Sequence, residues 1–227
     1  MKTTDAHLIL GTAHLGVTPG KCSPDKVLSE AKWSREIVTE LYDIFSGVYG
    51  INTYIDYLSL MPDQKMTGKD ADETQSLELA RRVKTVNTIA TRHPGQTFYI
   101  SIHVNGAGNS GNWTNARGWS AYTSVGKTKS DTLAEFLYKA ADKNLAEYKN
   151  FGKFSGSQKP IRTDKSDGDL DLEAGYYVLR KTSCPAVLTE NMYQDNKDDV
   201  RFLMSDAGKQ AIVRLHLEGF LSYLETI

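Results

Sequence analysis

The chain has 227 residues, of which 40% are hydrophobic and 24% charged, and 27 basic and 28 acidic residues leave a net charge of −1. This composition is that of a globular chain with a sizeable core, most simply folded as one domain over residues 1–227. The balanced charge argues against a nucleic-acid-binding surface, which needs clustered positive charge. No apolar run approaches the roughly 20 residues of a membrane span.

The N-terminal segment 1–16 has one lysine followed by a short apolar stretch. A signal peptide would need a longer apolar run and a small-residue cleavage site, so we expect either a mature, trimmed form or a protein stored in the cytoplasm. Cys22 and Cys184 form no CxxC motif and are too few for a disulfide framework. Both are expected to be free thiols.

Apolar runs typical of strands alternate with amphipathic helical stretches along the chain. This alternation predicts an α/β fold of three layers, with a central mixed, mostly parallel sheet flanked by helices. In chain order the sequence predicts a strand at 7–13, a helix at 29–50, a strand at 52–58, a helix at 73–95, strands at 96–104 and 118–125, a helix at 130–148, strands at 174–180 and 185–190, a short helix after Asn196, and a helix at 206–224.

Two segments in the second half of the chain show further local signals. The helix at 130–148 begins with Ser130 and Asp131, both good N-cap residues. The span 150–173 is polar and rich in glycine, which predicts a long surface loop. Loops of that length in compact domains are usually functional or disordered.

Histidine and glutamate side chains, which can bind metals or transfer protons, follow several of the predicted strands. In sheets of this class, ligands bind at the carboxyl ends of the strands, where loops leave for the helices. His14 follows the first strand, His103 ends the run "FYISI", and Glu190 ends the run "PAVLT". Glu30, at the start of the first helix, is reached by the loop that leaves the first strand.

Two histidines and one carboxylate are a common protein ligand set for a hydrolytic Zn²⁺, with the fourth position left open for water. His14, Glu30 and His103 suit the ligand role, and Glu190 suits the general base that takes the proton of the water. The ligands lie 16 and 73 residues apart and no HExxH motif is present. Placement alone therefore leaves open that each histidine is a buried structural residue.

Four stretches resemble successive motifs of the zinc-dependent N-acetylmuramoyl-L-alanine amidases that cut bacterial cell wall. They are "TAHLGVTPGKCSPDKVLSEAKWSREIV", "FYISIHVN", "ARGWSAYTS" with "SDTLAEFL", and "PAVLTENMYQDNKDDVRFL". The resemblance implies that His14, Glu30 and His103 hold zinc and that Glu190 is catalytic. It also places Asn196 at a turn where the family commonly has asparagine.

The sequence departs from this family around the first histidine. The family usually has a glycine on both sides of that histidine and an acidic residue just upstream, whereas this chain has Ala13, Leu15 and Gly11. The missing acid could have oriented an imidazole, so metal affinity is the property that its loss affects. Met192, where a small residue is frequent, suggests a reshaped pocket floor.

The resemblance implies that the substrate is peptidoglycan, cut at the amide between the lactyl group of N-acetylmuramic acid and L-alanine. Proximity to His103 in the sequence makes Asn105, Trp113, Trp119 and Tyr122 candidates for substrate contact. We expect a monomer that acts on the cell wall, either as a host remodelling enzyme or as a phage lysin.

Three alternatives remain beside this interpretation. "AYTSVGKT" at 121–128 fits a loose phosphate-loop pattern between a strand and a helix, although it has only one glycine. A zinc carboxypeptidase-like peptidase acting on stem peptides would use similar ligands on a related sheet. A cell-wall-binding module without catalysis is disfavoured because all four chemical positions keep competent residues.

Overall fold

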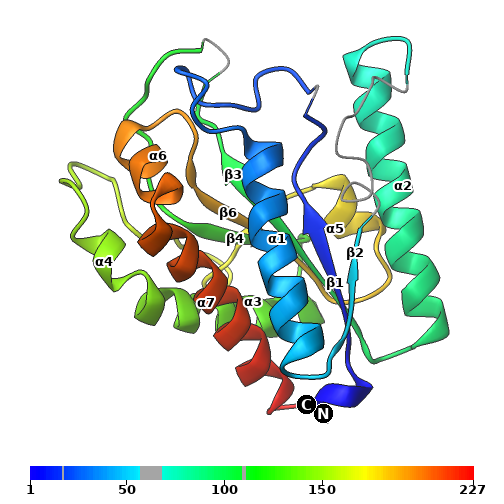
Figure 1. Ribbon diagram of the computed structural model, residues 1–227. Helices are drawn as coiled ribbons and strands as arrows, with labels where there is room; N and C mark the ends of the chain where they lie inside the picture. Colours follow the sequence, from blue (N-terminus) through cyan, green and yellow to red (C-terminus); the bar gives the residue numbers. More distant parts are fainter. Residues whose placement is uncertain (17, 57–67, 109–110) are drawn as a thin grey trace.

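The computed structural model describes residues 1–16, 18–56, 68–108 and 111–227. In these ranges six strands form one sheet with the order β2–β1–β3–β6–β4–β5 (Figure 1). Strands β2, β1, β3 and β6 run parallel, whereas β4 is antiparallel to β6 and parallel to β5, so the expected mixed, mostly parallel sheet is confirmed. The strands are β1 (His7–Thr12), β2 (Asn52–Ile55), β3 (Thr97–Asn105), β4 (Ser120–Thr123), β5 (Leu172–Glu173) and β6 (Ala186–Tyr193).

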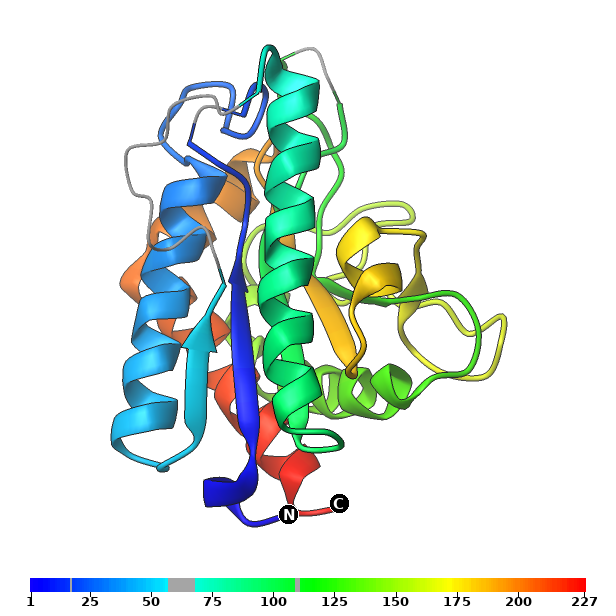
Figure 2. The same ribbon diagram turned by 90° about the vertical axis from the view of Figure 1, so that its right-hand side faces the viewer.

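Helices cover both faces of the sheet, as the expected three layers require. Helices α1, α3 and α7 lie on one face, and α2 and α5 lie on the other (Figures 1 and 2). The two termini lie side by side, and the N-terminal ammonium donates to the carbonyl of Leu224 at 2.8 Å. The helices are η1 (Thr3–Asp5), α1 (Glu30–Gly47), α2 (Ala71–Arg92), α3 (Lys129–Asn144), α4 (Ala146–Lys149), α5 (Tyr177–Lys181), α6 (Lys197–Met204) and α7 (Asp206–Leu224).

The two faces of the sheet carry separate apolar clusters, because successive side chains of a strand point to opposite sides. Leu8 and Leu10 of β1 pack in the larger cluster with residues of α1, α3 and α7. Ile9 of β1 and Tyr99 of β3 pack in the smaller cluster with Val86 of α2. Burial on both faces explains why the central strands are apolar runs without polar alternation.

The strand predicted at 174–180 is wrong, since residues Tyr177–Lys181 form the short helix α5. The aromatic and β-branched residues of this segment suggested a strand. Val178 and Leu179 are neighbours in sequence, yet both are buried in the α2-side cluster. A strand would point them to opposite faces, whereas one helical turn directs both toward the sheet.

The helix predicted at 130–148 is split at Leu145 into α3 and α4. Its N-cap is Thr128, and Asp131 completes a capping box by accepting from the backbone N–H of Thr128. Ser130 has another role, because its Oγ accepts a hydrogen bond from the backbone N–H of Ala186 at the start of β6.

The predicted loop 150–173 contains β5 at its end, and residues 150–171 otherwise form no helix or strand. Ile161 makes an isolated bridge with Trp119, and Asp171 is buried, so this segment packs on the edge of the sheet. The strand predicted at 52–58 is observed as β2, and residues 57 and 58 lie outside the described residues.

Candidate functional site

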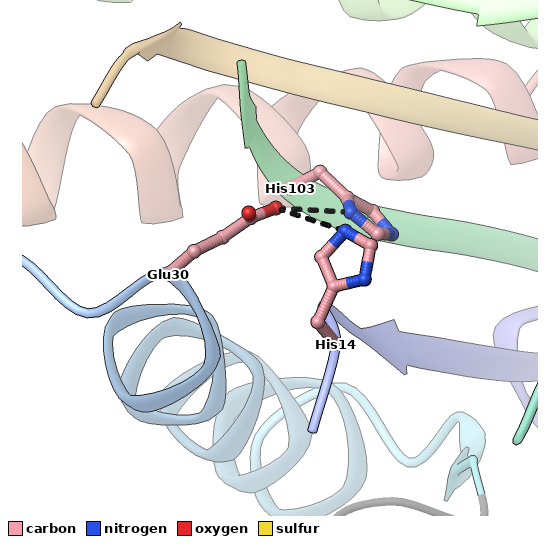
Figure 3. Close-up of side chains that lie close together, drawn as sticks. All are labelled: His14, Glu30 and His103. Atoms are coloured by element: carbon pink, nitrogen blue, oxygen red, sulfur yellow. Dashed lines mark hydrogen bonds and ion pairs between the residues drawn. The ribbon is translucent and has the colours of Figure 1, made fainter. Parts of the chain in front are cut away.

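The three predicted ligands meet at the carboxyl end of the sheet. His14 follows β1, Glu30 is the first residue of α1, and His103 lies near the end of β3 (Figure 3). Glu30 Oε1 lies 3.1 Å from His103 Nδ1 and 3.8 Å from His14 Nε2. One donor atom from each side chain lies within 4.8 Å of the other two, an arrangement that could hold one metal ion.

Helix α1 fixes this arrangement by binding both histidine-bearing segments. Ser34 Oγ accepts from the backbone N–H of Ala13 and donates to the carbonyl of Ile102, at 2.9 and 2.6 Å. Glu30 Oε1 also accepts from the backbone N–H of Val104 at 3.1 Å. The first two turns of one helix therefore set the spacing between the loop after β1 and the end of β3.

Burial and charge give His14 and Glu30 the protonation states that a cation requires. Burial lowers the pKa of His14 to about 3, against the opposing charge of Glu30. Burial alone would raise the pKa of Glu30, but His14 and the hydrogen bond to His103 outweigh it and bring that pKa to about 2. A neutral imidazole therefore faces an ionised carboxylate at neutral pH, and Glu30 Oε2 has no hydrogen-bond partner among the described residues.

Glu190 lies on β6 directly opposite His103 of β3, as its partner in the parallel register. Its Oε2 is buried without a hydrogen-bond partner in the part of the chain that the structure describes. Burial, and then the charge of Glu30, raise the pKa of Glu190 well above its usual value. This carboxyl therefore holds a proton more readily than an exposed glutamate does, which suits a group that exchanges protons with a substrate.

All four residues line one cleft of about 760 Å³. Its walls also include Lys21 from the loop before α1, Glu78 of α2 and Tyr176 before α5. Lys21 lowers the pKa of Glu30 and Glu190 through its charge. The sequence analysis did not single out Lys21, since no pattern marks a loop lysine as facing a cleft.

The predicted substrate contacts are not all in this cleft. Asn105 lines it. Tyr122 stands behind the wall, with its ring 5.4 Å from that of Tyr176. Trp119 is fully buried, and its Nε1–H donates to Asn191 Oδ1 at 2.9 Å. Trp113 lies in a separate groove of about 560 Å³ with Lys197.

Trp119 therefore acts in the core rather than on the cleft surface. Asn191, which accepts from the Trp119 indole, also donates from Nδ2 to the carbonyl of His103 at 2.9 Å. The tryptophan thus supports His103 indirectly, through the backbone that carries this histidine. Trp119 follows a glycine-rich loop, and the sequence pattern there does not distinguish a core residue from a surface residue.

Met192 is another position where the structure differs from expectation. It is fully buried in the larger core cluster, so it does not form the pocket floor. Its φ is 62°, a left-handed conformation that favours glycine. It lies where the register between β3 and β6 shifts, between His103 and Asn105. In this chain, position 192 therefore affects backbone conformation and core packing rather than the shape of the cleft.

Comparison with known proteins bears directly on this site. A family model described as N-acetylmuramoyl-L-alanine amidase matches residues 9–222. The chain belongs to this amidase family. One curated relative is the N-acetylmuramoyl-L-alanine amidase CwlM from Bacillus licheniformis, which is 29% identical over 68% of this chain and 48% of the relative. Another is the endolysin of Bacillus phage SPP1, which is 30% identical over 56% of this chain and 40% of the endolysin. The amidase-family chain thus spans about half or less of these relatives.

Solved structures show the same fold as the amidase-family chain. The N-acetylmuramoyl-L-alanine amidase from Clostridium difficile 630 is 18% identical with a TM-score of 0.72, and 97% of each chain is covered. The catalytic domain of CwlV from Bacillus (Paenibacillus) polymyxa var. colistinus is 16% identical with a TM-score of 0.68, covering 98% and 99%. Within the described ranges of the amidase-family chain, no helix is long and apolar enough to cross a membrane.

The loop with the phosphate-loop pattern does not favour nucleotide binding. A phosphate site needs free backbone N–H groups at the start of the helix. Here the N–H of Gly126 donates to Glu173, that of Thr128 to Asp131, and that of Ser130 to Thr128 Oγ1. The turn is therefore a self-capped start of α3.

Proposed function

We propose that the chain is a zinc-dependent N-acetylmuramoyl-L-alanine amidase, which hydrolyses the amide between N-acetylmuramic acid and L-alanine of peptidoglycan. The observation that carries the proposal is the meeting of His14, Glu30 and His103 within 4.8 Å, with Glu190 in the same cleft. Family membership supports the bond that is cut. The residues of the site support the metal.

The donor set fits Zn²⁺ on its own chemistry. Two imidazole nitrogens and one carboxylate oxygen are borderline-soft and hard donors of the kind that zinc accepts in hydrolases, with a position left for substrate or water. The lowered pKa of His14 keeps that imidazole free of a competing proton, and Glu30 supplies negative charge. When bound, the ion would act as a Lewis acid that polarises the amide carbonyl and makes water more acidic.

Glu190 performs the proton transfers in this proposal. Its carboxylate accepts a proton at Oε2 from the attacking water, and the raised pKa of Glu190 helps it to keep that proton until the amine departs. It then donates the proton to the departing amino group of L-alanine, because an amide leaves readily only as the neutral amine. The glycan then ends in a lactyl carboxylate and the peptide in a free amine.

Asn105, at the end of β3 on the cleft wall, is proposed to contact the substrate through its side-chain amide. Tyr122 would act through Tyr176, against which its ring packs. The proposed active form is a monomer, in which residues 1–227 work as one catalytic domain at the cell wall. Relatives named as an amidase and as a phage endolysin are consistent with either a host or a phage role.

The experiment that tests this function combines metal content with product analysis. The purified chain should hold close to one Zn²⁺, and digested cell wall should show new L-alanine amino termini. Glu190→Gln should keep zinc and lose hydrolysis by a factor of about 10²–10⁴, the usual contribution of a general base. His103→Ala should lose the zinc.

Glu36→Gln is a matched control on α1, because Glu36 is exposed and pairs only with Lys209 among the described residues. It should keep both zinc and activity. Cleavage within the stem peptide would instead indicate a carboxypeptidase-like enzyme. Full activity of Glu190→Gln would show that another group transfers the proton.

A further inference from the structure

A chain of buried hydroxyl groups connects His103 to a carboxylate from another strand. His103 Nδ1 faces Glu30, and its other nitrogen, Nε2, lies 3.1 Å from Ser101 Oγ. Ser101 Oγ lies 3.4 Å from the hydroxyl of Tyr99, which lies 3.3 Å from Asp56 Oδ2. We call Ser101, Tyr99 and Asp56 the His103 relay.

The strand geometry brings these groups together. Tyr99, Ser101 and His103 alternate along β3, so their side chains share the face that is covered by α2. Asp56 directly follows β2, and Arg82 reaches it from α2. Tyr99 and Asp56 are fully buried and Ser101 is 1% exposed, so protein groups must satisfy these polar atoms.

The carboxylate end sets the direction of every hydrogen bond in the relay. Asp56 forms an ion pair with the Arg82 guanidinium, and a carboxylate in an ion pair only accepts hydrogen bonds. Tyr99 must therefore donate its proton to Asp56, which leaves its oxygen to accept from Ser101. Ser101 Oγ in turn accepts from His103 Nε2. When Nδ1 binds a metal it carries no proton, so the ring proton lies on Nε2, where Ser101 Oγ accepts it. Without a metal, Nδ1–H donates to Glu30 in competition with this arrangement.

Asp56 also holds the other histidine-bearing segment. Its Oδ1 accepts from the backbone N–H and the Oγ1 of Thr12, at 3.3 and 3.2 Å. Thr12 is the last residue of β1, two positions before His14. One buried carboxylate thus fixes the end of β1 directly and the His103 ring through two hydroxyls.

We propose that Asp56, acting through Tyr99 and Ser101, is a positioning residue that fixes the His103 tautomer whose Nδ1 binds the metal. This proposal rests on the proposed function, since it assumes that His103 is a ligand. In this proposal Ser101 is the hydrogen-bond partner of His103 Nε2, the ring nitrogen that does not face Glu30.

Gly11 makes the relay possible. A Cβ on Gly11 would lie 2.4 Å from the Tyr99 hydroxyl and 2.8 Å from Ser101 Oγ. No side chain at position 11 can coexist with both hydroxyls in these places. Gly11→Ala should therefore displace the relay without touching any ligand.

The test compares two buried tyrosine hydroxyls. Tyr99→Phe removes only the middle of the relay, whereas Asp56→Asn leaves Arg82 poorly paired and risks unfolding. Tyr138→Phe is the matched control, since Tyr138 is 3% exposed and packs on the other face of the sheet. Among the described residues its hydroxyl hydrogen-bonds only to backbone atoms, those of Ala121 and Arg162. Zn²⁺ affinity is measured by competition with a chromophoric chelator, alongside a thermal unfolding curve for each protein.

We expect Tyr99→Phe and Gly11→Ala to bind Zn²⁺ about 10- to 100-fold more weakly, the usual effect of removing an outer partner of a ligating histidine. Tyr138→Phe should lose thermal stability but keep the wild-type Zn²⁺ affinity within about twofold, because no ligand partner changes. Equal Zn²⁺ affinities for the Tyr99 and Tyr138 variants would overturn the proposal.

A second readout needs no metal. Nitrogen-15 NMR of the histidine rings in metal-free protein at pH 8 should show the same share of His103 protonated on Nε2 in the wild type and in Tyr138→Phe. In Tyr99→Phe the proton should move toward Nδ1 and Glu30. An unchanged ring spectrum would contradict the relay, whereas a wild-type chain that binds no zinc would refute the proposed function instead.

Discussion

Asp171 should make the stability of the protein depend on pH. Its buried carboxyl lies just before β5 and accepts a hydrogen bond of 2.6 Å from Thr123 Oγ1. Burial, and then the charge of Asp169, raise the pKa of Asp171 from 3.8 to about 7, against the opposing effect of that hydrogen bond. Between these two pH values the folded protein holds a proton that the unfolded chain has released.

Because the folded state binds more protons, stability falls as the pH rises through this window. A shift of about three units corresponds to at most about 4 kcal/mol. Asp169 shares part of this effect, so we assign ~2 kcal/mol to Asp171. Asp171→Asn keeps an oxygen for Thr123 and removes the ionisation. It should equal the wild type only at and below about pH 3.8, and its advantage should grow with pH until it melts about 4–8 °C higher at pH 8.

The assay is thermal unfolding followed by circular dichroism, for both proteins at pH 5, 6, 7 and 8 and constant ionic strength. Groups that titrate in the same way in both proteins do not contribute to the difference in Tm between them. Asp164→Asn is the control on the same segment, since a hydrogen bond from Ser166 lowers the pKa of the exposed Asp164. A Tm difference for Asp171→Asn that does not grow with pH would refute the reasoning.

Three further predictions concern stability. Arg82→Met should cost about 3–5 kcal/mol in urea unfolding, since it leaves the buried carboxyls of Asp56 and Glu78 without their cation; a loss below about 1 kcal/mol would contradict this pairing. Gly118→Ala should cost on the order of 2 kcal/mol by the same method, because φ is 110° and the new Cβ would lie 2.1 Å from the Lys159 carbonyl. Thr128→Ala removes the capping box of α3 and should lower stability by about 1 kcal/mol, whereas Thr128→Ser should retain it.

The central sheet was predictable because its strands are buried on both faces. Continuous apolar runs such as the one at 7–13 and the one at 96–104 can only be central strands or buried helix segments, and their length favours strands. The alternation with long amphipathic helices then fixes parallel pairing. A short element has too few residues to show a clear period, which is why the pattern of Tyr177–Lys181 predicts a strand although these residues form a helix.

The meeting of His14, Glu30 and His103 was predictable from topology together with the family resemblance. In a parallel sheet, side chains at the carboxyl ends of neighbouring strands meet, so His14 and His103 follow from the order β1–β3. Substrate contacts could not be found in the same way. Nearness to His103 in sequence does not fix depth, and Trp119 is buried although it lies beside the glycine-rich loop.

Signals of the His103 relay were nevertheless present in the sequence. Arg82 lies at helical spacing between Leu79 and Val86, on the apolar stripe of α2, where a charge must find a buried partner. Asp56 interrupts an apolar run in the same way. Pairing the two requires the position of α2 against β2 and β3, which no local pattern supplies.

The absence of an acid at position 11 leads to different conclusions in the sequence and in the structure. From the sequence alone, its loss predicts a less firmly oriented imidazole. What the imidazole requires, however, is an acceptor at the end of a hydrogen-bond chain, and the acceptor need not come from a fixed position. Because residue 11 is glycine, there is space for the Tyr99 and Ser101 hydroxyls, and Asp56, which directly follows β2, supplies the carboxylate. The relay and the glycine therefore depend on each other, and changing either one alone should weaken the metal site.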